Sequence, residues 1–298
     1  MTPAISLTGV SRRYRDQLAL DGIDLVVDGP SITGLLGRNG AGKTTLLRII
    51  AAHEFASAGR IAVLGADPVE NDAVLARIAF VREDQAFPQF RVRHALEAAS
   101  SFFPNWDAEL AGELAADFEL PMNRWVSKLS RGMRSALSVV IGLAARAEVT
   151  LFDEPYAGLD AVARGVFYDR LLADYAEHPR VVMLSSHLID EVSGLLERVV
   201  MLDRGRIVLD AAADEVRGAF TRVSGAAEAV EEFVAGRAVL ERRRIASQEA
   251  AVVAGGLDDG DRPWAQELRV SLEPLSLQQV LIHTSAHAGR QRKEGTSA

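Results

Sequence analysis

A glycine-rich segment at residues 37–44, with the sequence GRNGAGKT, constrains the fold more than any other part of the chain. It fits the pattern G-x-x-x-x-G-K-[ST] of a phosphate-binding P-loop. The apolar run at residues 32–36 predicts a short buried strand before it, and residues 46–50 carry apolar side chains at helical spacing after it. A strand, a glycine loop and a helix in this order are what a phosphate cradle requires, so we expect a phosphate site here.

Each residue type in this segment has a place in phosphate chemistry. Glycines allow backbone conformations closed to other residues and let main-chain N–H groups approach the phosphates. The helix N-terminus adds a partial positive charge. Lys43 is expected to reach the β- and γ-phosphates, and the Thr44 hydroxyl to ligate Mg²⁺. The predicted binding residues of the segment are Gly37, Arg38, Asn39, Gly40, Ala41, Gly42, Lys43, Thr44 and Thr45.

Composition narrows the class of protein. A chain of 298 residues is long enough for one main domain and an appendage. The formal net charge of −8 argues against a nucleic-acid partner. Because there is no cysteine, disulfides, thiolate zinc sites and iron–sulfur clusters are excluded. Residues 1–7 are too short and too polar for a signal peptide, and no run approaches the roughly 18 apolar residues of a membrane helix. If the protein works at a membrane, another protein must span it.

Hydrophobic patterns predict an α/β chain with an all-helical insertion. Strands are expected before the glycine segment at 5–10, 18–20 and 23–27, and after it at 59–65, as an edge strand, and at 78–81. Helices are expected at 92–101, 107–118 and 130–145. Strands return at 149–152, 181–185 and 199–202, with a helix at 161–176. Strand–helix–strand order predicts a doubly wound, largely parallel sheet.

After about residue 214 the sequence changes character. Strands are expected at 220–224, 238–244 and 250–254, and helices at 226–234 and 275–284, with an acidic, glycine-rich loop at 257–262. This pattern predicts a small α+β appendage, followed by a mobile tail after His287.

Two carboxylates follow the apolar strand expected at 149–152. Such a strand would deliver Asp153 to the C-terminal edge of a sheet, where ligands of these folds bind. There Asp153 can hold Mg²⁺, and Glu154 can polarise the water that attacks the γ-phosphate. The alternative is a strand that ends in solvated acids. The position about a hundred residues after a P-loop, with a further acid at Asp160, favours the catalytic interpretation.

Two other motifs are weaker alone. Ser130 is a candidate N-cap at the start of a helix, and the helix start with Gly132 also offers a second anion site; capping alone is the alternative. His187 follows a strand, where a lone histidine is more often structural. After an acid-bearing strand it is placed to contact the γ-phosphate and sense its loss.

In this order the motifs resemble those of the nucleotide-binding subunit of ABC transporters, over about residues 3–212. Residues 37–44 match Walker A, Asp153-Glu154 match Walker B, residues 130–133 lie where the LSGGQ signature belongs, and residues 157–160 match the D-loop. The resemblance implies a P-loop NTPase core with a mixed, largely parallel sheet, an antiparallel β subdomain and a helical insertion. It further implies a domain at 1–214 with the helical subdomain at about 92–145, and leaves 215–298 as an accessory region.

The resemblance also implies roles for single residues. Lys43, Glu154 and His187, the switch histidine, would be catalytic, and Thr44, Asp153 and Glu83 would hold the metal. Tyr14 would stack on adenine; a packed surface tyrosine is the alternative. The remaining implied contacts to ATP are Ser130, Arg131, Gly132 and Asp160. ATP and Mg²⁺ are the implied cofactors, and two copies meeting head to tail would sandwich two ATP molecules.

The sequence departs from the family pattern in two functional places. The signature is S-R-G-M, in which Arg131 adds bulk and charge and Met133 lacks a hydrogen-bonding amide. The Q-loop glutamine is replaced by Glu83, counting from the strand at 78–81, with Gln85 as the alternative. Lys43 and both carboxylates remain, so we expect a working ATPase.

The resemblance implies a second nucleotide-binding subunit and an integral membrane permease as partners. A short helix of the permease would enter a groove near residues 83–106, where Phe87, Phe90, Phe102, Phe103 and Trp106 supply apolar surface; core packing is the alternative for these side chains. The sequence of residues 81–84 (VRED) and the C-terminal extension resemble those of exporter ATPases of the bacitracin-resistance kind. The implied location is cytoplasmic, peripheral at the inner face of the cell membrane.

Two other classes compete with this interpretation. One is a soluble ABC-type ATPase acting on ribosomes, DNA or metal-cluster assembly, although neither long coiled coils nor a second cassette is evident. The other is a nucleotide sensor that does not hydrolyse, against which the Asp153-Glu154 pair argues.

Overall fold

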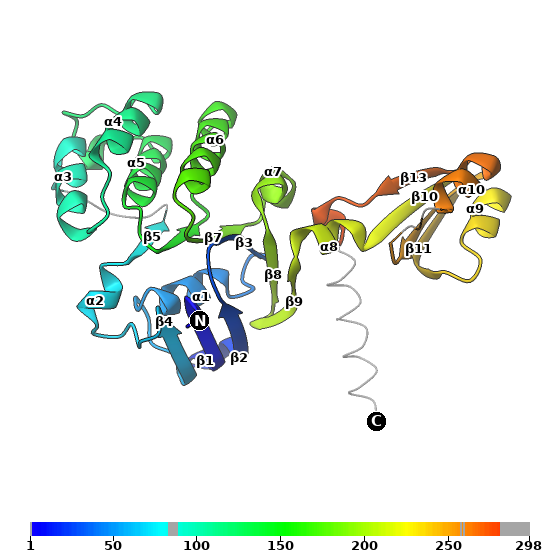
Figure 1. Ribbon diagram of the computed structural model, residues 1–298, viewed down its shortest axis with the longest axis horizontal. Helices are drawn as coiled ribbons and strands as arrows, with labels where there is room; N and C mark the ends of the chain where they lie inside the picture. Colours follow the sequence, from blue (N-terminus) through cyan, green and yellow to red (C-terminus); the bar gives the residue numbers. More distant parts are fainter. Residues whose placement is uncertain (1, 83–88, 257, 259, 281–298) are drawn as a thin grey trace. The chain divides into compact units, whose positions relative to one another are not determined.

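The computed structural model describes residues 2–82, 89–256, 258 and 260–280. The chain forms two compact units (Figure 1). The first contains Met1–Leu188 and Leu195–Ile207, and the second contains Ile189–Gly194 and Val208–Ala298.

An antiparallel sheet opens the first unit. It has three strands, β1 (Ile5–Tyr14), β2 (Gln17–Val27) and β4 (Ala58–Val63), in the order β2-β1-β4. The sequence predicted two strands, at 18–20 and 23–27, where β2 is one. Gly22, which lies between them, adopts a φ of 62° at a register shift between β1 and β2, as in a β-bulge, so the strand continues.

The second sheet of this unit carries the P-loop. Its six strands are β3 (Ser31–Leu36), β5 (Ile78–Arg82), β6 (Val149–Asp153), β7 (Val181–Ser186), β8 (Arg198–Asp203) and β9 (Arg206–Ala212), in the order β5-β6-β7-β3-β8-β9. The pairs from β5 to β8 are parallel, as predicted. Because parallel strands end at the same edge, the loop after β3 and the acids after β6 are brought to one rim of the sheet.

Helices cover this sheet and form the insertion. They are α1 (Lys43–Ile50), α2 (Asp72–Leu75), α3 (Val92–Phe102), α4 (Ala108–Asp117), α5 (Arg131–Ala144) and α6 (Ala161–Glu177), with a 3-10 turn at Val126–Lys128. Asp107 caps α4 through the backbone N–H of Leu110, and α5 contacts α3, α4 and α6 (Figure 1). The predicted helical block at 92–145 therefore forms around α5, of which the residues from Ser135 to Ala144 are all buried.

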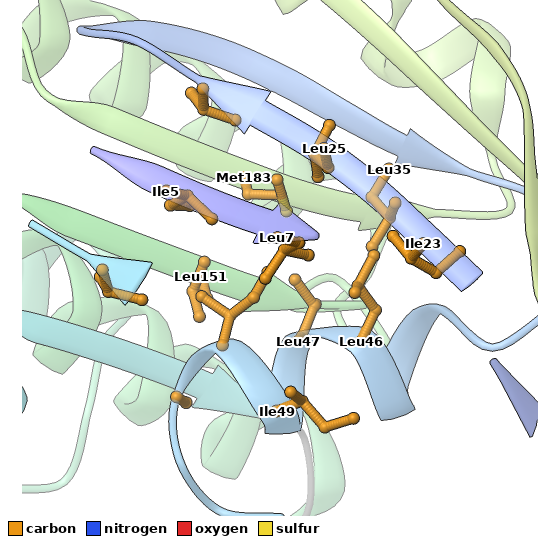
Figure 2. Packing of buried hydrophobic residues seen from close by; sticks show 14 of the residues in the cluster. Ile5, Leu7, Ile23, Leu25, Leu35, Leu46, Leu47, Ile49, Leu151 and Met183 are labelled. Atoms are coloured by element: carbon orange, nitrogen blue, oxygen red, sulfur yellow. The ribbon is translucent and has the colours of Figure 1, made fainter. Parts of the chain in front are cut away.

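The core of the first unit joins its two sheets around α1. Figure 2 shows apolar side chains of β1 and β2 directed toward those of α1 and of the parallel strands. The labelled members are Ile5, Leu7, Ile23, Leu25, Leu35, Leu46, Leu47, Ile49, Leu151 and Met183. Because α1 packs against both sheets, its N-terminus has a defined position, and so does the glycine loop that leads into it.

The second unit contains a four-stranded antiparallel sheet with two helices. Along the chain these are β10 (Phe220–Ala226), α9 (Ala227–Phe233), β11 (Ala238–Ile245), β12 (Gln248–Ala254), α10 (Asp261–Leu268) and β13 (Ser271–Pro274). The strand order β11-β12-β10-β13 and the β-α-β-β-α-β succession are those of a ferredoxin-like arrangement. Three short elements, α7 (Ile189–Val192), a 3-10 turn (Ser193–Leu195) and α8 (Ala213–Gly218), precede it.

Several elements of this unit differ from the sequence prediction. Residues 257–262 were expected to be a loop, but α10 begins at Asp261. Pro263 lies in its first turn, where a missing N–H removes no helical hydrogen bond. The short strand β13 was not predicted. Of the helix expected at 275–284, residues 277–280 are helical, and 281–284 lie outside the described residues.

Candidate nucleotide-binding site

The glycine loop connects β3 to α1 and can be built only from glycine at its ends. Gly37 and Gly42 have φ values of 154° and 109°. A Cβ on Gly37 would lie 2.4 Å from the carbonyl oxygen of Leu202, and one on Gly42 would lie 2.7 Å from that of Ala19. Gly42 is the N-cap of α1, and no described side chain caps this end. The first N–H groups of α1 therefore remain available to an anion.

Lys43 is buried at the start of α1, with an exposed fraction of 5%. Its Nζ donates to the carbonyl oxygens of Gly37, at 2.8 Å, and Arg38, at 3.3 Å. Burial lowers the pKa of the Lys43 ammonium, and the neighbouring carboxylates of Glu154 and Asp153 partly oppose this. The loop carbonyls carry only partial negative charge. Phosphate oxygens would give this cation a full counter-charge.

We expect the affinity for ATP to fall as the pH rises into the alkaline range, and the fall should begin at a lower pH than the titration of an ordinary lysine. The pKa of Lys43 in the free protein is lowered, and bound phosphate would raise it again by adding negative charge. Binding then takes up a proton, and the dissociation constant rises once pH passes the free-protein pKa. Calorimetry in buffers of different ionisation enthalpy measures both the proton uptake and the dissociation constant. Constant affinity up to pH 10 would contradict this assignment.

Thr44 and Asp153 place two side-chain oxygen atoms next to each other. The Thr44 hydroxyl donates to Asp153 Oδ1 at 3.1 Å, and the Ser185 hydroxyl donates to the same oxygen at 2.8 Å. Ser185 is the registered neighbour of Asp153 across the β6–β7 pair. Within the described residues no group of three or more His, Cys, Asp or Glu side chains could hold a metal alone. A hydroxyl and one carboxylate beside a phosphate site suit Mg²⁺, which usually takes its other ligands from phosphate and water.

Glu154 lies between the lysine and the histidine that the sequence singled out. Its Oε1 is 3.1 Å from His187 Nδ1 and 3.9 Å from Lys43 Nζ. Glu154 adopts a left-handed φ of 49°, rare for a residue with a side chain, and its N–H donates to the Ser185 hydroxyl at 3.0 Å. The turn after β6 thus directs this carboxylate toward the phosphate loop, where a water-activating base is needed.

Three residues of the site were not assigned a role from the sequence. Ser185 holds both Asp153 and Glu154, and Tyr156 and Ser186 support His187. The buried Tyr156 hydroxyl donates to Ser186 Oγ at 2.8 Å and accepts from the His187 N–H at 3.1 Å. Burial raises the pKa of Tyr156 to about 12, so the phenol stays protonated. The available signal was the pair of serines at the end of the buried strand β7, next to the strand that bears the acids.

Replacing Tyr156 with phenylalanine is expected to destabilise the fold by about 1–3 kcal/mol, because Ser186 Oγ and the His187 N–H lose a partner in a buried place. ATP turnover should also fall, since His187 loses its anchor. Urea denaturation and steady-state ATPase assays measure the two effects. Tyr175→Phe is the matched control, because the Tyr175 hydroxyl bonds the exposed carboxylate of Glu197 away from the site. Equal effects of the two changes would contradict the assigned role of Tyr156.

The signature segment lies against the D-loop of its own chain. Ser130 caps α5 by accepting from the Met133 N–H at 3.2 Å, as predicted. A Cβ on Gly132 would lie 2.6 Å from the carbonyl oxygen of Gly158, and one on Gly158 would lie 2.9 Å from Arg131 Cγ. Asp160 caps α6 by accepting from the Ala163 N–H at 2.9 Å. The start of α5 and the D-loop are thus in close contact, while the predicted contacts to a second copy's ATP remain predictions.

The remaining predicted contacts lie at the periphery. Tyr14 ends β1 and is exposed, with the Arg12 guanidinium 4.7 Å from the centre of its ring. Thr45 lies in the first turn of α1. Glu83 and the alternative Gln85 lie outside the described residues, so the choice between them stays open.

The predicted aromatic surface divides into exposed and packed members. Phe90 and Phe102 are exposed, with Phe102 at 74%, whereas Phe103 packs against the buried Ala79, Ala145 and Ala147. Trp106 is partly buried, and Phe87 lies outside the described residues. Exposed Trp125, not singled out from the sequence, carries the Arg91 guanidinium 5.1 Å from its ring centre.

Comparison with known proteins agrees with this geometry. The family model described as ABC transporter matches residues 20–157. The daunorubicin resistance ATP-binding protein DrrA3 of Streptomyces coeruleorubidus is 34% identical over 72% of this chain and 70% of its own length. The aliphatic sulfonates import ATP-binding protein SsuB 1 of Nocardia farcinica is 32% identical over 70% of this chain and 82% of its own length.

Solved structures share the fold. An ATP-binding subunit of an ABC transporter superposes with a TM-score of 0.66 at 23% identity, covering 72% of this chain and 92% of that chain. None of the helices in the described part of the chain is long and apolar enough to cross a membrane. The motifs, the fold and the relatives agree: the chain belongs to the family of ABC transporter ATP-binding proteins and is an ATP-hydrolysing subunit of that family.

Proposed function

We propose that this chain hydrolyses ATP with Glu154 as the base and so drives export through a separate membrane permease. The observation that carries the proposal is the position of the Glu154 carboxylate, within 4 Å of both Lys43 Nζ and His187 Nδ1, directly after the strand that bears Asp153. A carboxylate in this place can orient a water molecule toward the γ-phosphate, while Lys43 stabilises the charge on the transferred phosphoryl group. His187 would contact the same phosphate and report its loss.

Mg²⁺ fits the oxygen pair of Thr44 and Asp153. When bound, the ion would neutralise charge on the β- and γ-phosphates. Ser185 holds the Asp153 carboxylate in place through the 2.8 Å hydrogen bond, so the ligand is oriented before the nucleotide arrives. Glu83 remains a proposed further ligand.

Two copies are proposed to close head to tail over two ATP molecules. Each nucleotide would contact the Walker A segment of one copy and Ser130, Arg131 and Gly132 of the other. Support comes from the N-terminus of α5, where Ser130 and the helix dipole offer a second anion site. A solved cassette of a bacterial ABC transporter that shares this fold is dimeric, with a TM-score of 0.61 at 20% identity. Tyr14 would stack on the adenine of the bound nucleotide.

A membrane permease is the proposed second partner, with the chain at the cytoplasmic face of the cell membrane. Phe90, Phe102 and Trp125 give the helical part of the first unit exposed aromatic surface of the kind enriched at protein interfaces. Residues 1–214 would form the ATP-binding domain, with its helical subdomain at about 92–145. Residues 215–298 would be an accessory region.

Export is proposed over import because several relatives carry export in their names. They include the Nod factor export ATP-binding protein I of Rhizobium etli, 33% identical over 70% of this chain and 67% of its own length. The sulfonate import relatives show that family membership alone leaves the direction open. The finer kinship with the bacitracin-resistance kind rests on residues 81–84 and the C-terminal extension.

Affinity purification of the full chain from detergent-solubilised membranes tests the partner. The proposal predicts an integral membrane protein in stoichiometric yield, lost when Phe90 and Trp125 are both changed to serine. Phe55→Ser is the control, because Phe55 is also exposed but lies outside the helical part. Recovery with ribosomes and without a membrane protein would favour the alternative, an ABC-type ATPase not tied to a transporter.

A further inference from the structure

The second unit contains a cavity of about 630 Å³ that has no part in the ATP site. It is lined by residues of α10, β10 and β13 and of the C-terminal end of α8. Its volume is within the range of about 300–1,000 Å³ typical of small-molecule sites. Gly218 and Gly256 line it without side chains, which leaves the space open.

One side of the cavity is polar. Arg262 and Gln266 lie one helical turn apart on α10, so their side chains share a face of the helix. Within the described residues, no carboxylate lies at ion-pair distance from Arg262. Arg217, also in the lining, is ion-paired with Asp214 and donates to the Ser193 carbonyl oxygen, so its guanidinium is held in place.

A threonine lines the same space. Thr221 in β10 is only 5% exposed and lies two residues before Val223, so both are on the helix-covered side of the sheet. Thr221 lines the cavity, and a threonine hydroxyl can donate or accept a hydrogen bond to a ligand there.

Other lining residues of the cavity are apolar. Val270, Leu272 and Pro274 line it from β13 and the turn before it, with the buried Ala265 of α10 beside them. An arginine, a threonine hydroxyl and several apolar side chains in one lining together favour a molecule with one anionic end and a short apolar body. A few polar groups that fix orientation within an apolar lining are the usual composition of small-molecule sites.

We propose that this cavity binds a small amphipathic carboxylate, with its anionic group at Arg262 and Thr221 and its apolar body against Val270 and Leu272. The second unit would then be a ligand-sensing domain on an ATP-hydrolysing subunit. The proposal does not depend on the partner or the direction of transport, because every group that it uses lies in the second unit.

Sodium hexanoate is the probe, titrated into the full chain by calorimetry and followed by amide NMR. We expect saturable one-to-one binding, with shifts confined to α10, β10 and β13, and at least about tenfold weaker binding of 1-hexanol, which lacks the charge. Arg262→Gln should weaken hexanoate binding at least about tenfold. Gly256→Leu should abolish it by filling the space, since a Cβ there has its nearest neighbour, the Gly218 oxygen, at 4.0 Å.

Arg243→Gln is the matched control, because it removes a cation from the exposed strand β11 outside the cavity lining. Circular dichroism establishes that each variant is folded, and Thr221→Val, close in shape to the native residue, tests the hydroxyl separately. Failure of hexanoate to saturate, or equal affinity of the wild-type, Arg262→Gln and Gly256→Leu proteins, would overturn the proposal. Binding seen only after removal of residues 281–298 would mean that the chain's own tail fills the cavity, which would also overturn it.

Discussion

Replacing Glu154 with glutamine is expected to lower steady-state ATP turnover by about 10²–10⁴-fold, the usual contribution of a positioned general base. The amide has nearly the same shape as the carboxylate but cannot accept the proton of the attacking water. Lys43, Thr44 and Asp153 are unchanged, so the dissociation constant for ATP should stay within a few-fold of the wild-type value. ATP would then persist in the site and hold two copies together.

Three measurements check this expectation: phosphate release, ATP affinity by calorimetry, and molar mass by light scattering with and without ATP. Glu148→Gln is the matched control. Glu148 lies just before the same strand β6, but its carboxylate pairs with Arg77 at a partly exposed place away from the phosphate loop. The control should hydrolyse ATP normally and dissociate after each turnover. Normal turnover by Glu154→Gln would exclude Glu154 as the base.

Replacing Asp174 with alanine is expected to destabilise the first unit by about 3–5 kcal/mol, the cost of removing one partner of a buried ion pair. Asp174 in α6 has a 3% exposed side chain and forms an ion pair with Arg180, which is 5% exposed, at 2.6 Å. Arg146, after α5, donates to the other Asp174 oxygen at 3.0 Å and forms an ion pair with Asp107 at 2.7 Å. The change therefore leaves the buried Arg180 guanidinium without its counter-charge.

Urea denaturation measures the loss, and Asp117→Ala is the matched control. Asp117 pairs with Arg170 between α4 and α6 at a partly exposed place, so the control should cost less than about 1 kcal/mol. The double change Asp174→Leu with Arg180→Met should recover much of the stability, because it removes both buried charges together. A loss below 1 kcal/mol for Asp174→Ala would show that the buried cluster is not fixed in the way described.

The proximity of the proposed phosphate-site residues could be predicted because these residues are close together in the sequence or directly follow a strand of the same sheet. The glycines, Lys43 and Thr44 lie in one short segment, and Asp153 and Glu154 directly follow an apolar run. Residues that are neighbours in the sequence are therefore also neighbours in the fold. The parallel sheet followed from the order of strands and helices. These features need few long-range contacts to be recognised.

The residues that hydrogen-bond the site residues and hold them in place could not be predicted in the same way. Ser185 acts through the register of β7 against β6, which brings its hydroxyl to Asp153, and sequence spacing does not reveal that register. Tyr156 acts through a turn that folds back onto the end of β7. In the second unit, α10 begins in an acidic, glycine-rich stretch with a proline in its first turn, which local propensity reads as a loop.

The dependence of ATP turnover on protein concentration tests the central claim most directly: the terminal phosphate is cleaved only after a second copy closes over it. The account predicts that turnover per subunit rises with concentration while the protein is mostly monomeric, and levels off once ATP-bound pairs dominate. Turnover per subunit that stays constant and full in a protein shown by light scattering to remain monomeric would contradict it.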